Sequence, residues 1–155
     1  GLKRFPIGLT VSWLAVLAVY QVAIAMLASA VQAPDNATTA FMMDTFRSAG
    51  IKPLLWVSVV LLLPVSEELL FRGFMFRGLL HSRLGAVGAV LITSVVWGGI
   101  HLQYDLFGML SIAGMGIVLG LARLATGSTW TTIAMHVAWN GLAVVSTELY
   151  LMNSA

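Results

Sequence analysis

The sequence has 155 residues, of which 59% are hydrophobic and only 9% are charged, and its mean hydropathy is +0.96. Soluble domains carry about a quarter charged residues, so this composition predicts an integral membrane protein and excludes an ordinary soluble domain. The chain has no cysteine, which excludes a disulfide scaffold, a thiolate metal site and a cysteine nucleophile. A formal charge of +2 does not favour nucleic acid as a partner.

Apolar segments long enough to cross a bilayer, which takes roughly 20 residues, recur along the chain. Five candidates lie at about 7–31, 53–80, 84–101, 106–124 and 128–152. The longest connection, 32–52, contains proline, aspartate and glycine and is predicted to be a surface loop with a short amphipathic helix at 38–48. The sequence therefore predicts an all-α, polytopic transmembrane helical bundle of about five spanning helices, in a single membrane-embedded domain over residues 1–155.

The first segment has two interpretations. Lys3 and Arg4, the apolar run and "ASA" at 28–30 resemble a signal peptide, but the apolar run exceeds the usual 7–15 residues, which favours a retained membrane helix. A chain that begins with Gly1 is expected to be a piece of a longer protein. If Lys3 and Arg4 are cytoplasmic, five alternating spans place three arginines on that side and two basic residues opposite: Arg77, Arg83 and Arg123, against Arg47 and Lys52.

Three charged residues interrupt the apolar stretch "LLLPVSEELLFRGFMF" at 61–76. Glu68 and Arg72 are four residues apart on one helix face, so we expect them to pair and to neutralise each other. Glu67 points about 100° away around the helix and has no local basic partner. Ionisable residues inside a membrane are costly, which makes Glu67 a candidate functional residue.

Two further polar pairs lie in later segments. "WGGIH" places Trp97 and His101 one helical turn apart, and "HVAWN" does the same for His136 and Asn140. A single buried histidine is usually a hydrogen-bonded core residue. Two histidines and a glutamate on three apolar helices favour a shared site, because each would be destabilising if left without a polar partner. By contrast, Tyr104 and Asp105 in the following loop are interpreted as an interfacial anchor.

This set of side chains permits several kinds of chemistry. A carboxylate with an imidazole can activate water for attack on a carbonyl, and a second imidazole and an amide can stabilise the oxyanion. Alternatively, Glu67, His101 and His136 could bind zinc, with water as the fourth ligand. The same residues could also relay protons in a transport protein. By simple helix rise, Glu67 lies about 10 Å deeper than His101, so a shared site requires tilted or broken helices, with Pro64 and the Gly98–Gly99 pair as candidate breaks.

The three motifs resemble those of the CPBP family, which includes the type 2 CAAX prenyl proteases and the bacteriocin-processing, Abi-like intramembrane proteases. "EELLFR" at 67–72 matches the family motif E-E-x-x-x-R. "WGGIH" at 97–101 is similar to F-x-x-x-H, with Trp97 in place of Phe, and "HVAWN" at 136–140 is similar to H-x-x-x-N/D. Their order and spacing fit the family, with a CPBP-like catalytic core at about 53–152 preceded by a first membrane helix and loop at 1–52.

The resemblance implies an intramembrane endopeptidase and suggests a role for each motif residue. In the family, the first glutamate and the first histidine hold the attacking water, which here implies Glu67 and His101. The second histidine and the Asn/Asp stabilise the oxyanion, which here implies His136 and Asn140.

Three other motif residues are expected to shape the site: Glu68, Arg72 and Trp97. Replacing the family's Phe by Trp97 keeps an aromatic ring and is not expected to alter the chemistry. Family members are often labelled metalloproteases, although the eukaryotic-type members resemble metal-independent glutamate proteases. With only three potential ligands we favour no metal; if zinc is bound, Glu67, His101 and His136 are its expected ligands.

The resemblance further implies a membrane-associated or lipidated protein or peptide as substrate, and the lipid bilayer as the surroundings of the site. Short loops favour a multi-pass protein of a bacterial inner membrane. The alternatives are a zinc-dependent version of the same protease, a non-catalytic scaffold or bacteriocin-immunity protein, and a proton-coupled transport protein. The inverted repeat of broken helices typical of transporters is not visible in the sequence.

Overall fold

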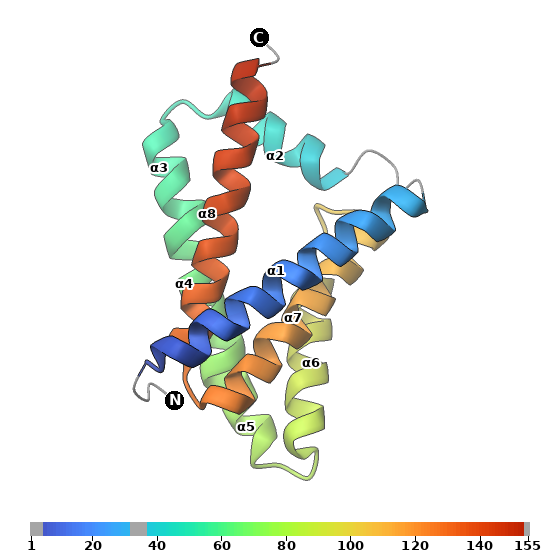
Figure 1. Cartoon of the computed structure of the whole chain (residues 1–155), viewed down its shortest axis with the longest axis vertical. Helices are drawn as coiled ribbons and strands as arrows, with labels where there is room; N and C mark the ends of the chain where they lie inside the picture. Colours follow the sequence, from blue (N-terminus) through green and yellow to red (C-terminus); the bar gives the residue numbers. More distant parts are fainter. Residues whose placement is uncertain (1–4, 32–36, 154–155) are drawn as a thin grey trace.

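The computed structural model describes residues 5–31 and 37–153, and within these ranges it contains helices and no strand (Figure 1). The first two helices are α1 (Ile7–Ala30) and α2 (Ala37–Ser48). A continuous helix, Lys52–Leu80, follows. The last three helices are α6 (Gly85–Gly99), α7 (Leu106–Thr126) and α8 (Thr129–Asn153). The bounds agree to within two residues with the segments predicted from hydropathy, and the short helix expected at 38–48 is α2.

The predicted membrane-spanning bundle is confirmed, and the number of spans is approximate. Among the described residues, three helices are both long and apolar enough to cross a membrane: α1 with 24 residues, Lys52–Leu80 with 29, and α7 with 21. Helix α6 is apolar but has only 15 residues, fewer than the roughly 20 that a bilayer requires. Helix α8 has 25 residues, and its threonine, histidine, asparagine and glutamate side chains make it more polar.

The long helix contains two π-helical stretches. It runs as α3 (Lys52–Val57), η1 (Ser58–Leu62), α4 (Leu63–Glu68), η2 (Leu69–Met75) and α5 (Phe76–Leu80). Pro64 lies in the first turn of α4, immediately after η1, where its missing N–H would otherwise have bonded within the helix. The helix is therefore widened on either side of the glutamates and is not broken at Pro64. Such π-bulges are frequent at functional sites.

Helices α6 and α7 approach each other closely at glycines. A Cβ atom on Gly98 would lie 2.7 Å from both the carbonyl oxygen of Met109 and the Cβ of Ala113. A Cβ on Gly116 would lie 3.0 Å from Ser94 Cα. The sequence suggested Gly98 as a helix break. The structure instead keeps α6 helical through Gly98 and uses the missing side chain for packing.

Helix α1 crosses the bundle obliquely over α7 and the beginning of α8 (Figure 1). Tyr20 donates a hydrogen bond to the carbonyl of Ser111 at 2.6 Å, and the hydroxyls of Thr10 and Thr131 lie 3.1 Å apart. Leu17 is buried in the main core cluster, whose other members come from η2, α6, α7 and α8. The bundle thus gathers η2, α6, α7 and α8 around one core, which includes the motif residue Trp97.

Candidate active site

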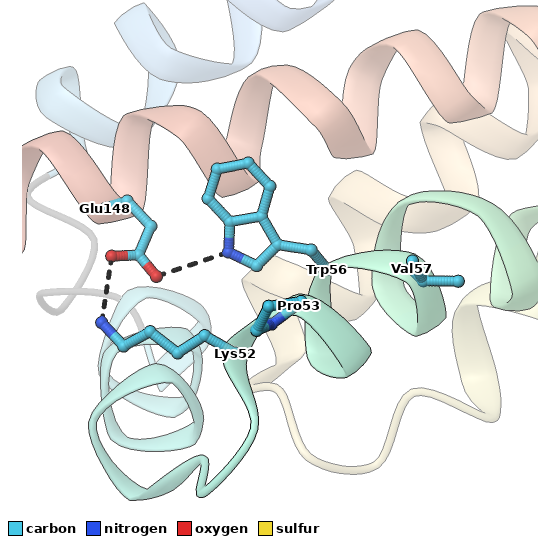
Figure 2. A pocket seen from close by; sticks show the side chains of 5 residues that line it. All are labelled: Lys52, Pro53, Trp56, Val57 and Glu148. Atoms are coloured by element: carbon cyan, nitrogen blue, oxygen red, sulfur yellow. Dashed lines mark hydrogen bonds and ion pairs between the residues drawn. The ribbon is translucent and has the colours of Figure 1, made fainter.

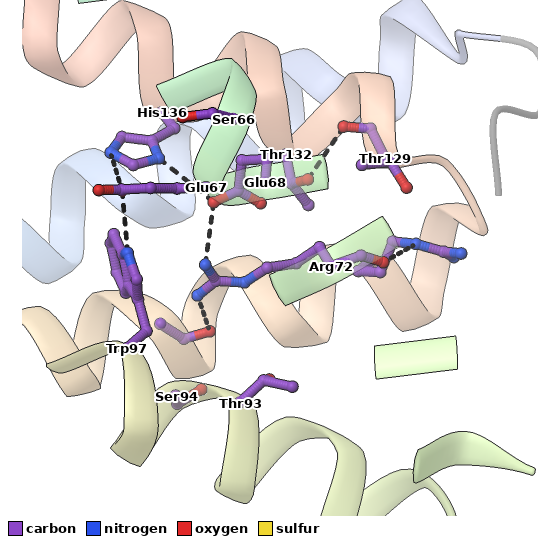
Figure 3. Close-up of polar contacts among 12 residues, drawn as sticks. Ser66, Glu67, Glu68, Arg72, Thr93, Ser94, Trp97, Thr129, Thr132 and His136 are labelled. Atoms are coloured by element: carbon purple, nitrogen blue, oxygen red, sulfur yellow. Dashed lines mark hydrogen bonds and ion pairs between the residues drawn. The ribbon is translucent and has the colours of Figure 1, made fainter. Parts of the chain in front are cut away.

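The second glutamate of the motif and its arginine form a buried pair on the long helix (Figure 3). Glu68 and Arg72 are both 0% exposed, and Arg72 Nη1 donates to Glu68 Oε1 at 3.0 Å. Arg72 Nη2 donates to the carbonyl oxygen of Gly116 on α7 at 3.2 Å. The guanidinium carbon also lies 4.5 Å from the ring centroid of Trp97, a cation–π contact. The guanidinium therefore neutralises Glu68 and links the long helix to α6 and α7.

His136 on α8 is held by the same carboxylate. Its Nδ1 lies 3.2 Å from Glu68 Oε1, and the residue is only 4% exposed. An ionised carboxylate only accepts hydrogen bonds, so Nδ1 is the donor in this contact. The ring is thereby oriented with Nε2 facing Glu67, at 3.9 Å from Glu67 Oε2. That distance is too long for a direct hydrogen bond and short enough for both atoms to contact one water molecule.

Glu67 has a different environment from its neighbour. Its Oε2 accepts a hydrogen bond from Trp97 Nε1 at 2.9 Å, and its side chain is 24% exposed. Among the described residues, no lysine or arginine forms an ion pair with it. The adjacent carboxylates thus differ in environment: Glu68 is buried and neutralised by Arg72, whereas Glu67 accepts from an indole N–H and is partly exposed.

His101 lies just beyond the end of α6, because the helix stops at Gly99 and not at the predicted residue 101. Its Nδ1 is 2.7 Å from the carbonyl oxygen of Trp97, and its ring meets the Trp97 ring edge-on with centroids 5.4 Å apart. The Trp97 ring also meets the ring of His136 at 5.2 Å. The two histidines are therefore brought to the same indole, which also holds Glu67.

Asn140 follows His136 by one turn on α8. Its Nδ2 donates to the carbonyl oxygen of Val59 at 2.9 Å. Val59 lies in η1, so the amide joins α8 to the first π-helical stretch. The second N–H of Asn140 and its carbonyl oxygen are not used in this bond.

The three proposed zinc ligands can be compared with the requirements of a metal site. In the described part of the chain, no three His, Cys, Asp or Glu side chains are gathered so that they could hold a metal ion. Glu67 and His136 approach each other, with 3.9 Å between Glu67 Oε2 and His136 Nε2, whereas His101 does not form a group with them that could hold a metal ion. The arrangement does not fit a zinc site, and ligation would require His101 to join the other two.

Several contacts at the site were not apparent from the sequence. The indole N–H of Trp97 bonds to Glu67, which the phenylalanine of the family motif could not do. The carbonyl oxygen of Gly116 accepts a hydrogen bond from Arg72. The Nε of Arg123 donates a hydrogen bond to the carbonyl oxygen of Arg72 at 3.1 Å. Gly116 and Gly120 are four residues apart on α7, a spacing typical of closely packed membrane helices. No sequence signal indicated Arg123.

A concave region lies away from these residues. It is a groove of about 540 Å³ lined by Lys52, Pro53, Trp56, Val57 and Glu148, where α3 meets the last turns of α8 (Figure 2). Glu148 accepts from Lys52 Nζ at 3.3 Å and from Trp56 Nε1 at 3.4 Å. The Glu148 carboxylate and the Lys52 ammonium group therefore neutralise each other, and the groove is lined by no motif residue.

The fold and the site together define a class of protein: an all-helical integral membrane protein whose apolar bundle encloses a neutralised Glu–Arg pair, an unneutralised carboxylate and two imidazoles. Residues 49–142 match the family described as type II CAAX prenyl endopeptidase, Rce1-like, and the chain belongs to this family. The matched range contains every motif residue from Glu67 to Asn140 and begins after α2. Comparison with curated proteins and with solved structures finds no match. Family membership indicates a CAAX-type protease that acts on membrane-associated protein substrates.

Proposed function

We propose that the chain hydrolyses a peptide bond in a membrane-associated or lipidated substrate by means of a water molecule activated by Glu67. The observation that carries this proposal is the contrast between the two adjacent glutamates. Glu68 is fully buried and paired with Arg72, whereas Glu67 has no arginine or lysine partner within the described residues and is oriented by Trp97. A carboxylate held in this way is suited to accept a proton.

The proposed reaction has two steps. In the first, a water oxygen attacks the carbonyl carbon of the substrate while Glu67 takes one of its protons. In the second, the carbon–nitrogen bond breaks and Glu67 returns the proton to the leaving amine. The distance of 3.9 Å between Glu67 Oε2 and His136 Nε2 leaves both atoms within reach of the same water or oxyanion.

The remaining motif residues assist in these steps. His136, with Nδ1 fixed by Glu68, and Asn140, with one N–H not used by Val59, are proposed to donate hydrogen bonds to the oxyanion. His101, whose Nδ1 is tied to the backbone, is proposed to use its other ring nitrogen to hold the water. Glu68, Arg72 and Trp97 keep these groups in place.

The test compares the wild-type chain with Glu67→Gln in detergent, on matched peptides with and without a prenyl group and a membrane anchor. We expect Glu67→Gln to lower the cleavage rate by about 10²–10⁴-fold, the usual contribution of a general base. Glu148→Gln is the matched control, because Glu148 lies at the far groove, and it should cleave at the wild-type rate. Cleavage by Glu67→Gln at the wild-type rate would refute the proposal.

The same assay separates the metal-independent enzyme from its zinc-dependent alternative. We expect cleavage to survive a chelator. Loss of cleavage on chelation, with recovery on adding zinc, would instead assign Glu67, His101 and His136 to the metal. If the protein's cellular function persists in Glu67→Gln, a non-catalytic scaffold would replace the enzyme.

A further inference from the structure

A chain of aromatic contacts runs from α2 into the site. The rings of Phe41 and Tyr104 meet edge-on with centroids 5.9 Å apart, and Tyr104 stacks on His101 at 5.8 Å and 16°. His101 meets Trp97 edge-on, and Trp97 meets His136 in the same way. The angles are those that aromatic pairs prefer, edge-to-face or offset-stacked. Four successive contacts thus connect a helix outside the family-matched range to the imidazole of α8.

His101 depends on its neighbours for its orientation, because it lies beyond the last turn of α6. The backbone forms a tight turn here, in which Tyr104 N donates to the carbonyl oxygen of His101 at 3.0 Å. This turn brings the Tyr104 ring over one face of the imidazole. The Trp97 carbonyl oxygen lies 2.7 Å from His101 Nδ1, and the Trp97 ring packs edge-on against the imidazole. Backbone hydrogen bond and ring contacts together leave His101 little rotational freedom.

Tyr104 enters this arrangement as a neutral ring. It lies in the loop between α6 and α7, where burial raises the pKa of its phenol above the usual value and the negative charge of Glu67 acts in the same direction. The phenol therefore stays protonated at physiological pH.

Helix α2 supports Tyr104 from outside the site. Phe46 of α2 is 0% exposed and anchors the helix to the bundle, whereas Phe41 is 43% exposed and presents its ring to Tyr104. Figure 1 shows α2 beside the loop that joins α6 to α7. The long connection at 32–52 is thus more than a surface loop, since part of it packs on the residue that stacks on His101.

We propose that Tyr104 is a positioning residue that holds the imidazole of His101 in its working orientation by ring stacking, and that Phe41 of α2 braces Tyr104. The orientation of His101 follows from the contacts alone, whereas its effect on catalysis rests on the proposed function. A ring at position 104 should be required, and the phenol hydroxyl should not.

The kinetic test uses the full chain and the peptide that the wild type cleaves. We expect Tyr104→Leu to lower kcat by about 10–100-fold with little change in KM, since small displacements of a catalytic group have effects of this size. Tyr104→Phe should recover most of the loss. Phe41→Leu should lower kcat several-fold, whereas its matched control Phe5→Leu, equally exposed at 44%, should not. An unchanged kcat in Tyr104→Leu, or an equal loss in Tyr104→Phe, would overturn the proposal.

A second readout is independent of cleavage. The Cε1–H resonance of His101, identified against His81→Gln and His136→Gln, should carry an upfield ring-current shift that is lost in Tyr104→Leu and retained in Tyr104→Phe. Tyr150→Leu, an exposed tyrosine of α8, is the control and should leave the resonance in place. If the shift behaves as expected and neither the wild type nor any variant cleaves peptide, the positioning of His101 holds and the proposed function fails. If the shift persists in Tyr104→Leu, the positioning itself is refuted.

Discussion

Among single side chains, Trp97 contacts four other motif residues of the site, which its place in the sequence did not predict. Its N–H holds Glu67 at 2.9 Å, its ring lies 4.5 Å from the Arg72 guanidinium carbon, and both imidazoles contact it. Since it is 2% exposed, these contacts form away from water and are stronger than on a surface. A phenylalanine would preserve the ring contacts and lose the hydrogen bond.

Replacing Trp97 by phenylalanine therefore tests one hydrogen bond. A bond to a charged group contributes about 1.5–3 kcal/mol, so we expect Trp97→Phe to lower kcat by about 10-fold or more by releasing Glu67. Trp130→Phe, at a 46% exposed position of α8, is the control. The measurement is kcat on the same peptide, and an undiminished value in Trp97→Phe would show that the indole N–H does not orient the base.

The buried ion pair makes a prediction about stability. Arg72→Met leaves the charge of Glu68 uncompensated in the core, which we expect to cost about 3–5 kcal/mol. Removing the second charge as well, in Glu68→Gln/Arg72→Met, should restore much of the stability without restoring cleavage, because Glu68 also holds His136. Thermal unfolding in detergent measures both variants. A double variant less stable than Arg72→Met would contradict this account.

The part of the site that could be predicted from the sequence is the part that depends on local spacing. Glu68 and Arg72 pair because residues four apart share a helix face, and this holds even though Arg72 lies in a π-helical stretch. Contacts between helices depend on tilt and axial register, which hydropathy does not specify. The approach of Trp97 to Glu67, and of Asn140 to Val59, could therefore not be predicted from spacing.

At the level of the elements, glycines set the distance between α6 and α7. A side chain at Gly98 would meet the α7 backbone, at Met109 O and at 2.9 Å from Ala113 N, so the helices would have to separate. Gly99, the next residue, has nothing within 4 Å of its would-be Cβ. Of these two adjacent glycines, Gly98 has no room for a side chain and Gly99 faces open space.

This contrast gives a matched pair of substitutions. We expect Gly98→Ala to destabilise the protein by about 1–3 kcal/mol, as overpacking usually does, and to lower activity because Gly98 follows Trp97 and lies three residues before His101. Gly99→Ala should be neutral or slightly stabilising, since alanine favours the helix. Thermal unfolding and cleavage rate should both separate the two variants. Equal behaviour would mean that the close approach at Gly98 does not hold the site together.

Hydropathy predicted the helices well and their internal irregularities poorly. The ends of α1 and α7 lie within two residues of the expected bounds because apolar length and flanking polar residues mark them directly. The π-helical stretches η1 and η2 have no comparable signature, although Pro64 signalled a disturbance near η1. Phe46, which anchors α2, could not be assigned to the core because an amphipathic pattern does not reveal what its apolar face meets.

On the scale of the whole molecule, the distribution of charge indicates how the bundle sits in the bilayer. Large aliphatic side chains are exposed along α1 and the long helix, as expected of surfaces that face lipid. Helix α5, the loop between α5 and α6 and the end of α7 lie at one end of the bundle, whereas α2 and the end of α8 lie at the other (Figure 1). The first three segments contain Arg77, Arg83 and Arg123. The arginine-rich end is expected to be cytoplasmic.

The absence of native cysteine allows a direct test of this orientation. Ser82, between α5 and α6, and Ser48, at the end of α2, are both exposed and both donate to a carbonyl at a helix end, at 2.7 and 2.8 Å. Single variants Ser82→Cys and Ser48→Cys are therefore a matched pair at opposite ends of the bundle. In sealed vesicles, a membrane-impermeant maleimide should label Ser82→Cys only from the cytoplasmic side and Ser48→Cys only from the other. Labelling of both from one side would mean that the long helix does not cross the bilayer, and Glu67 would then lie outside the membrane interior.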